Sequence, residues 1–299
     1  MGIASFSGIM ADAEQHSYAV GYFESWNMES LLAVADAAER TRSPVILGFS
    51  GISLPDRARS RPEHLEDYHA LASAVARRLT VPACLLFNEC ANTDWISAAV
   101  RLGFGLVMFS DDDCDAQRLV EQTRRTAELA HASSAAAEGE PDPLPGTSGD
   151  LGAAPEDAQL TDPDSARRFV AETGVDSLAV SVGQAHLHGR RKVTLDLDRL
   201  SWIRDFVDVP LALHGATSLS PADLREAVRR GVRKVNIGSA LKKAYFEALR
   251  ASCGAAGSAY NPYRVLGSGL PGDVAQAARE ALSRVVEEYM ALLGSAGKA

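Results

Sequence analysis

The chain has 299 residues, of which 46% are hydrophobic and 23% charged, and its formal net charge at pH 7 is −9. This length gives one large domain or two ordinary ones, with ample material for a core. The field of so negative a chain repels polyanions, so nucleic acid and anionic membranes are excluded as main partners, whereas a small phosphorylated substrate held by local donors is not.

Eight short apolar runs predict eight buried β-strands. They lack the alternation of half-exposed strands, as is typical of a parallel sheet. In chain order they span residues 18–23, 44–48, 82–87, 106–109, 134–138, 177–182, 210–213 and 234–237. Helices are predicted over residues 28–42, 64–79, 93–102, 116–132, 162–174, 220–231, 240–251 and 273–293.

The helix over residues 220–231 shows clear start and stop signals. Ser220 is expected to cap it, Pro221 takes the first helical position and Gly231 ends it. Residues 140–160, by contrast, are rich in Gly, Pro, Asp and Ala and have no periodicity. A loop this long is usually a functional lid or disordered. Because the strand–helix alternation resumes directly after it, we expect a mobile flap within a single domain spanning residues 1–299.

Strands that are nearly all followed by helices indicate a (β/α)8 TIM barrel, an α/β fold, more than a doubly wound sheet. In such a barrel the reactive groups gather at the carboxyl ends of the strands, and phosphate often binds after strands seven and eight. The polar residues at these ends are Glu89, Glu138, His186, His214 and Asn236. Five polar groups from five strands would thus converge on one mouth, which predicts a functional site there.

Several phrases make the sequence similar to a known family. They are Ser43-Pro-Val-Ile-Leu47, Arg101–Phe104 with Val107–Phe109, Thr161-Asp-Pro163, Thr173–Asp176 with Leu178–Val180, Leu213-His-Gly215, Lys234-Val-Asn-Ile237 and Leu293–Lys298. Nearly end to end, they resemble the class II (metal-dependent) fructose-bisphosphate and tagatose-bisphosphate aldolases. In that family three histidines bind zinc, one of them beside a catalytic aspartate after the third strand. A cradle rich in Gly, Ser and Thr holds the phosphate of dihydroxyacetone phosphate.

The resemblance implies a metal and substrate site formed mostly by the second half of the chain. It makes His186 and His214 ligands of a divalent metal, expected to be Zn²⁺. The groups that it implies for binding the substrate and its phosphate are Gly183, Gly215, Thr217, Asn236, Gly238 and Ser239. Glu138 and Glu140 match a Glu-x-Glu phrase after the fifth strand and are candidate catalytic residues. The three glycines could instead serve only tight turns.

The sequence departs from the family at the residues expected to be catalytic. The family's Asp-His-Gly after the third strand is replaced by Asn88-Glu89-Cys90. The Asn88 amide cannot transfer a proton as a carboxylate does. Glu89 is either the third metal ligand, as in His2Glu zinc sites, or a carboxylate that only hydrogen-bonds its neighbours. The phosphate phrase Gly-Gly-Ser-Gly has become Gly215-Ala-Thr-Ser218, in which the methyl of Ala216 crowds the backbone.

The flap departs as well, because it lacks the Gly-Gly-x-Glu-Asp run of the family, for which Glu156-Asp157 is a loose substitute. The general base therefore stays open among Glu138, Glu140, Asp111 and a flap carboxylate. We expect residues 111–113 and Asp115 to cap the helix that follows, since carboxylates favour a helix N-terminus.

Three functions remain open. The first is a metal-dependent aldolase or lyase on a ketose phosphate or a related non-standard substrate, in which the metal polarises a carbonyl and stabilises an enediolate. Without the family's aspartate, it is not expected to be an efficient fructose-bisphosphate aldolase. The second is a metal-dependent sugar-phosphate isomerase or epimerase that uses the same enediolate. The third is a catalytically inactive binding protein.

The chain also carries signals about its location and assembly. It has no apolar run long enough to span a bilayer, and its start, Met1–Phe6, lacks the regions of a signal peptide. Its four cysteines are scattered without a Cys-x-x-Cys pair. We therefore expect a cytoplasmic protein with free thiols, and the resemblance implies a homo-oligomer, either a dimer or a tetramer.

Overall fold

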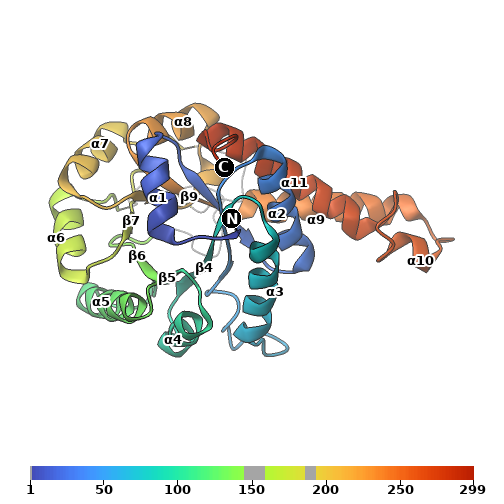
Figure 1. Ribbon diagram of the computed structural model, residues 1–299, viewed down its shortest axis with the longest axis horizontal. Coiled ribbons are helices and arrows are strands. Elements are labelled where there is room, and N and C mark those ends of the chain that lie inside the picture. Colours follow the sequence, from blue (N-terminus) through green and yellow to red (C-terminus); the bar gives the residue numbers. More distant parts are fainter. Residues whose placement is uncertain (1, 145–158, 186–192) are drawn as a thin grey trace.

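A computed structural model describes residues 2–144, 159–185 and 193–299. Within these residues eight parallel strands close into a barrel, which confirms the predicted (β/α)8 TIM barrel (Figure 1). The strands are β2 (Val20–Ser25), β3 (Val45–Ser50), β4 (Pro82–Cys90), β5 (Leu106–Phe109), β6 (Ala136–Gly139), β7 (Ser177–Ala179), β8 (Leu211–Leu213) and β9 (Val232–Ile237). Each pairs with the next, and β9 pairs with β2 to complete the circle. A short strand β1 (Gly2–Ile3) joins the start of β4.

The predicted helices are all present in the described part of the chain. They are α2 (Met28–Thr41), α3 (Leu65–Arg78), α4 (Thr93–Leu102), α5 (Ala116–Ala132), α6 (Pro163–Thr173), α8 (Pro221–Arg229), α9 (Ser239–Ala256) and α11 (Val274–Leu293). Further elements were not predicted, namely β1, α1 (Phe6–Gln15), α7 (Leu197–Phe206), the 3₁₀ turn η1 (Ala216–Ser218) and α10 (Pro262–Val265). None of the described helices is both long and apolar enough to cross a membrane.

The side chains of the strands form two apolar layers. A large core lies between the barrel and its surrounding helices, and a smaller cluster fills the barrel interior. The inner cluster includes Val20, Tyr22, Ile46, Cys84, Leu86 and Leu106. Helix α1 adds its apolar face to this cluster, through Phe6, Ile9 and Met10. The interior is thus packed rather than hollow, and the site must lie at a rim of the barrel.

The local signals at the helix ends explain why these elements form. Ser220 accepts a hydrogen bond from the Asp223 amide at 3.1 Å, as predicted for the start of α8. The glycine that follows the helix, Gly231, has a φ of 101°, which few other residues adopt. Asp115 caps α5. The expectation that Asp111 also caps it is wrong, because the Asp111 carboxylate instead accepts from the Asp113 amide in the preceding turn.

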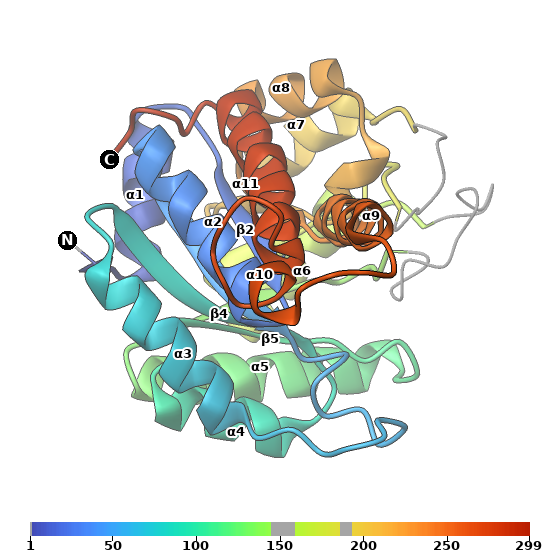
Figure 2. The same cartoon turned by 90° about the vertical axis from the view of Figure 1, so that its right-hand side faces the viewer.

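The C-terminal helices extend the barrel, as predicted. Helix α11 packs against both α2 and α9, and Figure 2 shows it lying between them. Helix α9, α10 and the start of α11 project from the barrel as an arm (Figure 1). Of the predicted flap at 140–160, residues 145–158 lie outside the described residues.

Candidate active site

A buried histidine stands at the carboxyl end of β8. His214 is fully buried, and its Nε2 lies 3.0 Å from Oε1 of Glu138 on β6. Its Nδ1 lies 2.9 Å from Oε1 of Glu89 at the end of β4, and 3.7 Å from Oε1 of Glu140. Three carboxylates around one imidazole outweigh the effect of burial, which alone would lower the pKa of His214, and they raise it to about 10.

Glu138 is fixed by a fully buried ion pair. Lys234 on β9 places Nζ 2.7 Å from the Glu138 Oε1, and both side chains are inaccessible to solvent. The hydroxyl of Ser177 donates to the other oxygen, Oε2, at 2.8 Å. Burial acts to raise the pKa of Glu138, but Lys234 and His214 overcome it and lower the pKa to about 2. Glu138 is therefore ionised and accepts a hydrogen bond from the Nε2–H group of His214. The other ring nitrogen, Nδ1, faces the mouth of the barrel. Metal-binding histidines are commonly oriented in this way.

The end of β4 is distorted at the position where Glu89 enters the site. The pairing of β4 with β5 shifts register between Phe87 and Cys90. Within this irregularity Glu89 has a φ of 53°, a left-handed conformation that costs a non-glycine residue about 1–2 kcal/mol. A bulge re-aims the side chains around it. Here it brings the Glu89 carboxylate beside His214 and leaves Asn88 almost fully buried.

Glu140, just past the end of β6, is also buried. Burial raises its pKa to about 8, and the charges of Glu89, Glu138 and Asp112 add to the rise, against the opposing effect of His214. Its Oε1 has no hydrogen-bond partner among the described residues. The structure therefore brings the three glutamates predicted from the sequence around one imidazole.

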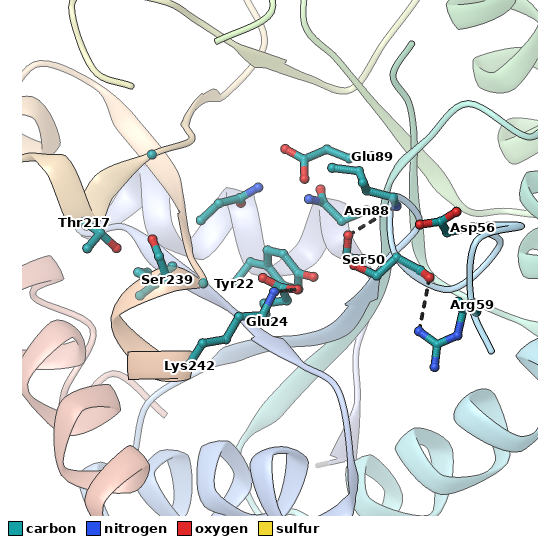
Figure 3. A pocket seen from close by; sticks show the side chains of 16 residues that line it. Tyr22, Glu24, Ser50, Asp56, Arg59, Asn88, Glu89, Thr217, Ser239 and Lys242 are labelled. Atoms are coloured by element: carbon teal, nitrogen blue, oxygen red, sulfur yellow. Dashed lines mark hydrogen bonds and ion pairs between the residues drawn. The ribbon is translucent and has the colours of Figure 1, made fainter. Parts of the chain in front are cut away.

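Two adjoining cavities open beside this cluster. The first, of about 550 Å³, is lined by Tyr22, Glu24, Ser50, Ile52, Ser53, Asp56, Arg59, Asn88, Glu89, Gly215, Thr217, Asn236, Ile237, Gly238, Ser239 and Lys242 (Figure 3). The second, of about 810 Å³, shares Ile52, Asp56 and Glu89 with the first and reaches Asp111–Asp113, Pro143 and Leu144. Glu89 thus stands on the boundary between the two.

Five of the six residues expected to bind substrate or phosphate line the first cavity, namely Gly215, Thr217, Asn236, Gly238 and Ser239. Gly215 has a φ of 62°, and a Cβ there would lie 2.9 Å from the Ala185 carbonyl oxygen, so the position requires glycine. The sixth, Gly183, has a φ of 112° and packs against the Thr194 carbonyl in a tight turn. The role of this set in binding phosphate stays a prediction.

A carboxylate of the protein itself lies against this cradle. Glu24, at the end of β2, packs its Oε2 against Gly238, and its Oε1 lies 2.7 Å from Nζ of Lys242. Figure 3 shows Glu24 and Tyr22 between Asn88 on one side and Thr217 and Ser239 on the other. Glu24 and Lys242 are not among the site residues predicted from the sequence, although Glu24 directly follows the predicted first strand.

Comparison with known proteins shows which protein family the chain is part of. The model of a family described as class-II fructose-bisphosphate aldolase matches residues 4–298. The chain belongs to this family. The members of this family are aldolases, which are lyases, and they generally depend on a divalent metal.

Solved aldolases share the whole fold. The YdjI aldolase from Escherichia coli K12 is 27% identical, with a TM-score of 0.79 and 99% of each chain covered. A proposed fructose-1,6-biphosphate aldolase from Coccidioides immitis is 25% identical, with a TM-score of 0.81, covering 98% of this chain and 97% of that one. The fructose-bisphosphate aldolase of Campylobacter jejuni, 19% identical with a TM-score of 0.78, covers 100% of this chain and 97% of its own, and supports the fold alone.

The fit of the residues of this family member to a metal is mixed. In the described part of the chain, no group of three His, Cys, Asp or Glu side chains is arranged to hold one. Two of the three predicted ligands, Glu89 and His214, are nevertheless in contact. Oε1 of Glu140 has no hydrogen-bond partner there. A buried carboxylate oxygen without a partner suits a cation, and so does the excess of carboxylates around His214. The third predicted ligand, His186, and its neighbour His188 lie outside the described residues.

The Lys234–Glu138 pair provides a test of how His214 is held. Replacing Lys234 by Met leaves the Glu138 carboxylate buried without a counter-ion, which should lower the free energy of unfolding by about 3–5 kcal/mol. Lys242→Met is the matched control, because Lys242 is half exposed and its pair with Glu24 should contribute no more than about 1 kcal/mol. Urea unfolding of both variants measures the difference. Equal losses would show that Lys234 does not anchor the site.

Proposed function

We propose that this protein is a metal-dependent aldolase that makes or breaks a carbon–carbon bond next to a ketone, on a ketose phosphate or a related non-standard substrate. The observation that carries the proposal is His214, whose Nε2 is held by Glu138 while Nδ1 faces Glu89 and Glu140 at the carboxyl end of the barrel. The family and the two neighbouring cavities support it, since a C–C bond-forming site must hold two substrate halves.

The proposed metal ligands are Glu89, His186 and His214, and the proposed metal is Zn²⁺. When bound, the metal would act as a Lewis acid on the substrate carbonyl and stabilise the enediolate that follows. Carboxylate oxygen and imidazole nitrogen are both ligands that zinc accepts. The charge of the ion would also compensate the excess of carboxylates around His214.

The other residues would bind, orient and move protons. Glu138 acts through His214 by fixing the ring and its tautomer. Glu140 is the proposed proton acceptor and donor, because its Oε1 is not engaged by the described residues. Asn88 would orient a substrate oxygen by hydrogen bonding. Gly183, Gly215, Thr217, Asn236, Gly238 and Ser239 are proposed to bind the end of the substrate, including a phosphate where one is present.

We also propose a single catalytic domain over residues 1–299 in a cytoplasmic protein. The match of the family model to nearly the whole chain supports the first statement, and four unpaired cysteines support the second.

Metal content tests the site directly. The purified protein should hold about one divalent ion per chain, and His214→Ala should remove it. His131→Ala should leave the metal in place, because His131 only pairs with Asp176 at the surface. Elemental analysis of dialysed protein, with circular dichroism to check folding, gives the answer. Retention of full metal by the double variant His186→Ala, His214→Ala would contradict the site.

Fructose 1,6-bisphosphate tests how far the mechanism of the family extends. General acid–base catalysis contributes about 10²–10⁴-fold, so a site with Asn88 should cleave this substrate very slowly. The double variant Asn88→Asp, Glu89→His should raise kcat. The control Asn27→Asp adds a carboxylate at the cap of α2 instead and should change nothing. Rapid cleavage of fructose 1,6-bisphosphate by the wild type would refute the expectation. Product analysis on ketose phosphates would show whether the protein is instead an isomerase or epimerase.

We further propose that the protein is a homo-oligomer that associates through the α9–α10 arm. The arm exposes Phe246, Tyr260, Tyr263, Leu266 and Leu270, and Tyr263 is 88% exposed. Apolar side chains gathered on a projecting element are typical of a protein interface.

Light scattering after size exclusion should therefore report a dimer or tetramer. Tyr263→Ser combined with Leu266→Ser should shift it toward the monomer, because the interface loses its apolar contacts. Trp202→Ser on α7 is the matched control, since this residue is also exposed and α7 lies away from the arm (Figure 1). A wild type that is monomeric at micromolar concentration would rule the proposal out.

A further inference from the structure

Among the described residues that line the first cavity, Tyr22 is the only aromatic one. It lies on β2, and its ring belongs to the apolar cluster that fills the barrel interior. The ring packs against this cluster, and Nζ of Lys234 lies 5.6 Å from the centroid of the ring. Only 2% of the residue is exposed. Tyr22 thus forms part of the floor of the cavity and is rigidly placed.

The hydroxyl of Tyr22 has no hydrogen-bond partner among the described residues. Two more uncharged groups of the same cavity share this property, namely the Asn88 Oδ1 and the Asn236 Nδ2. Asn88 is 2% exposed and Asn236 is 8% exposed. The orientation of the Asn236 amide follows from its Oδ1, which accepts from Lys234 at 2.6 Å. Nδ2 is therefore the atom that remains for a ligand.

The three groups come from three strands and lie close together. Tyr22 and Asn236 are direct partners in the pairing of β2 with β9, and Asn88 stands at the end of β4. A buried polar group without a partner costs about 1–3 kcal/mol. Three such groups in one cavity indicate that a ligand completes them. They comprise an amide donor, a carbonyl acceptor and a hydroxyl, and this combination matches the alternating hydroxyl and carbonyl oxygens of a sugar chain.

The surroundings of Tyr22 favour one role for its hydroxyl. Burial raises its pKa well above the usual value, and the nearby charges of Glu24, Glu89 and Glu138 add to the rise. The group therefore stays protonated and has a hydrogen to donate. A substrate oxygen that faces Tyr22 would accept a hydrogen bond from a donor that is held in place by a strand and not by a flexible loop.

We propose that the Tyr22 hydroxyl is a specificity-determining group that donates a hydrogen bond to an oxygen of a polyhydroxylated ketone or aldehyde bound in the first cavity. This inference rests on the proposed function for the identity of the cavity as the substrate site. It adds a residue to that site and narrows the substrate class to chains that carry an oxygen opposite Tyr22. A site built to hydrogen-bond a hydroxyl discriminates strongly against analogues that lack it.

Tyr22→Phe tests the assignment because it removes the hydroxyl and keeps the ring. Ligand-observed NMR titrations would measure the binding of dihydroxyacetone and of D-fructose to the wild type and the variant, both incubated with Zn²⁺ beforehand. The dissociation constant of at least one probe should rise about tenfold in the variant, as expected for one lost hydrogen bond. Metal content should not change. The melting temperature should stay equal or rise, because an unsatisfied buried hydroxyl is removed.

Tyr245→Phe is the matched control. The Tyr245 hydroxyl accepts from Asn27 at 3.4 Å and does not line the first cavity. This variant should bind both probes as the wild type does.

The outcomes separate the assignment from the proposed function. Unchanged binding of both probes by Tyr22→Phe, or a lowered melting temperature without weaker binding, overturns the assignment even where metal and aldol products are found. Failure of the wild type, incubated with Zn²⁺, to bind either probe overturns it as well. If the wild type holds no metal and forms no aldol product, but Tyr22→Phe still weakens probe binding tenfold, the proposed function fails and the assignment stands.

Discussion

One buried cation organises the site. Lys234 neutralises Glu138, and Glu138 in turn fixes the imidazole of His214. The same ammonium group fixes the Asn236 amide and lies over the ring of Tyr22. Taking two charges out of water is costly, and such pairs are often no more stabilising than apolar residues of the same size. Here the pair orients two functional groups at once, the His214 imidazole and the Asn236 amide, which an apolar replacement could not do.

The sequence predicted where this site lies better than how it works. Because parallel strands end on the same rim, Glu89, Glu138 and His214 could be expected to meet once the strands were recognised. Glu138 can support His214 from within the barrel because Lys234 neutralises it. Lys234 begins the predicted eighth strand, and no local pattern reveals its partner. Tyr22 was assigned to a strand, and its unsatisfied hydroxyl becomes visible only when its neighbours are known.

The distortion at the end of β4 falls where the chain departs from its family. Asn88 and Glu89 occupy the place of the family's aspartate and histidine, and Glu89 adopts a left-handed backbone inside a register shift. Strained residues of this kind persist where the surrounding structure over-determines them, and they concentrate at functional sites. No propensity scale predicts such a conformation for a glutamate. The backbone at this point therefore had to come from the structure.

The hydrogen-bond and ion-pair partners described for the His214 ring lie on strands or directly at their ends. The segments that wall the cavities elsewhere, such as residues 51–59 and 110–113, connect strands to helices. The residues around His214 are thus positioned by the strands, whereas the connecting segments shape the entrance to the cavities. Such a division makes the barrel modular: insertions or exchanges in the connecting segments could give it new substrates while the catalytic frame is inherited unchanged.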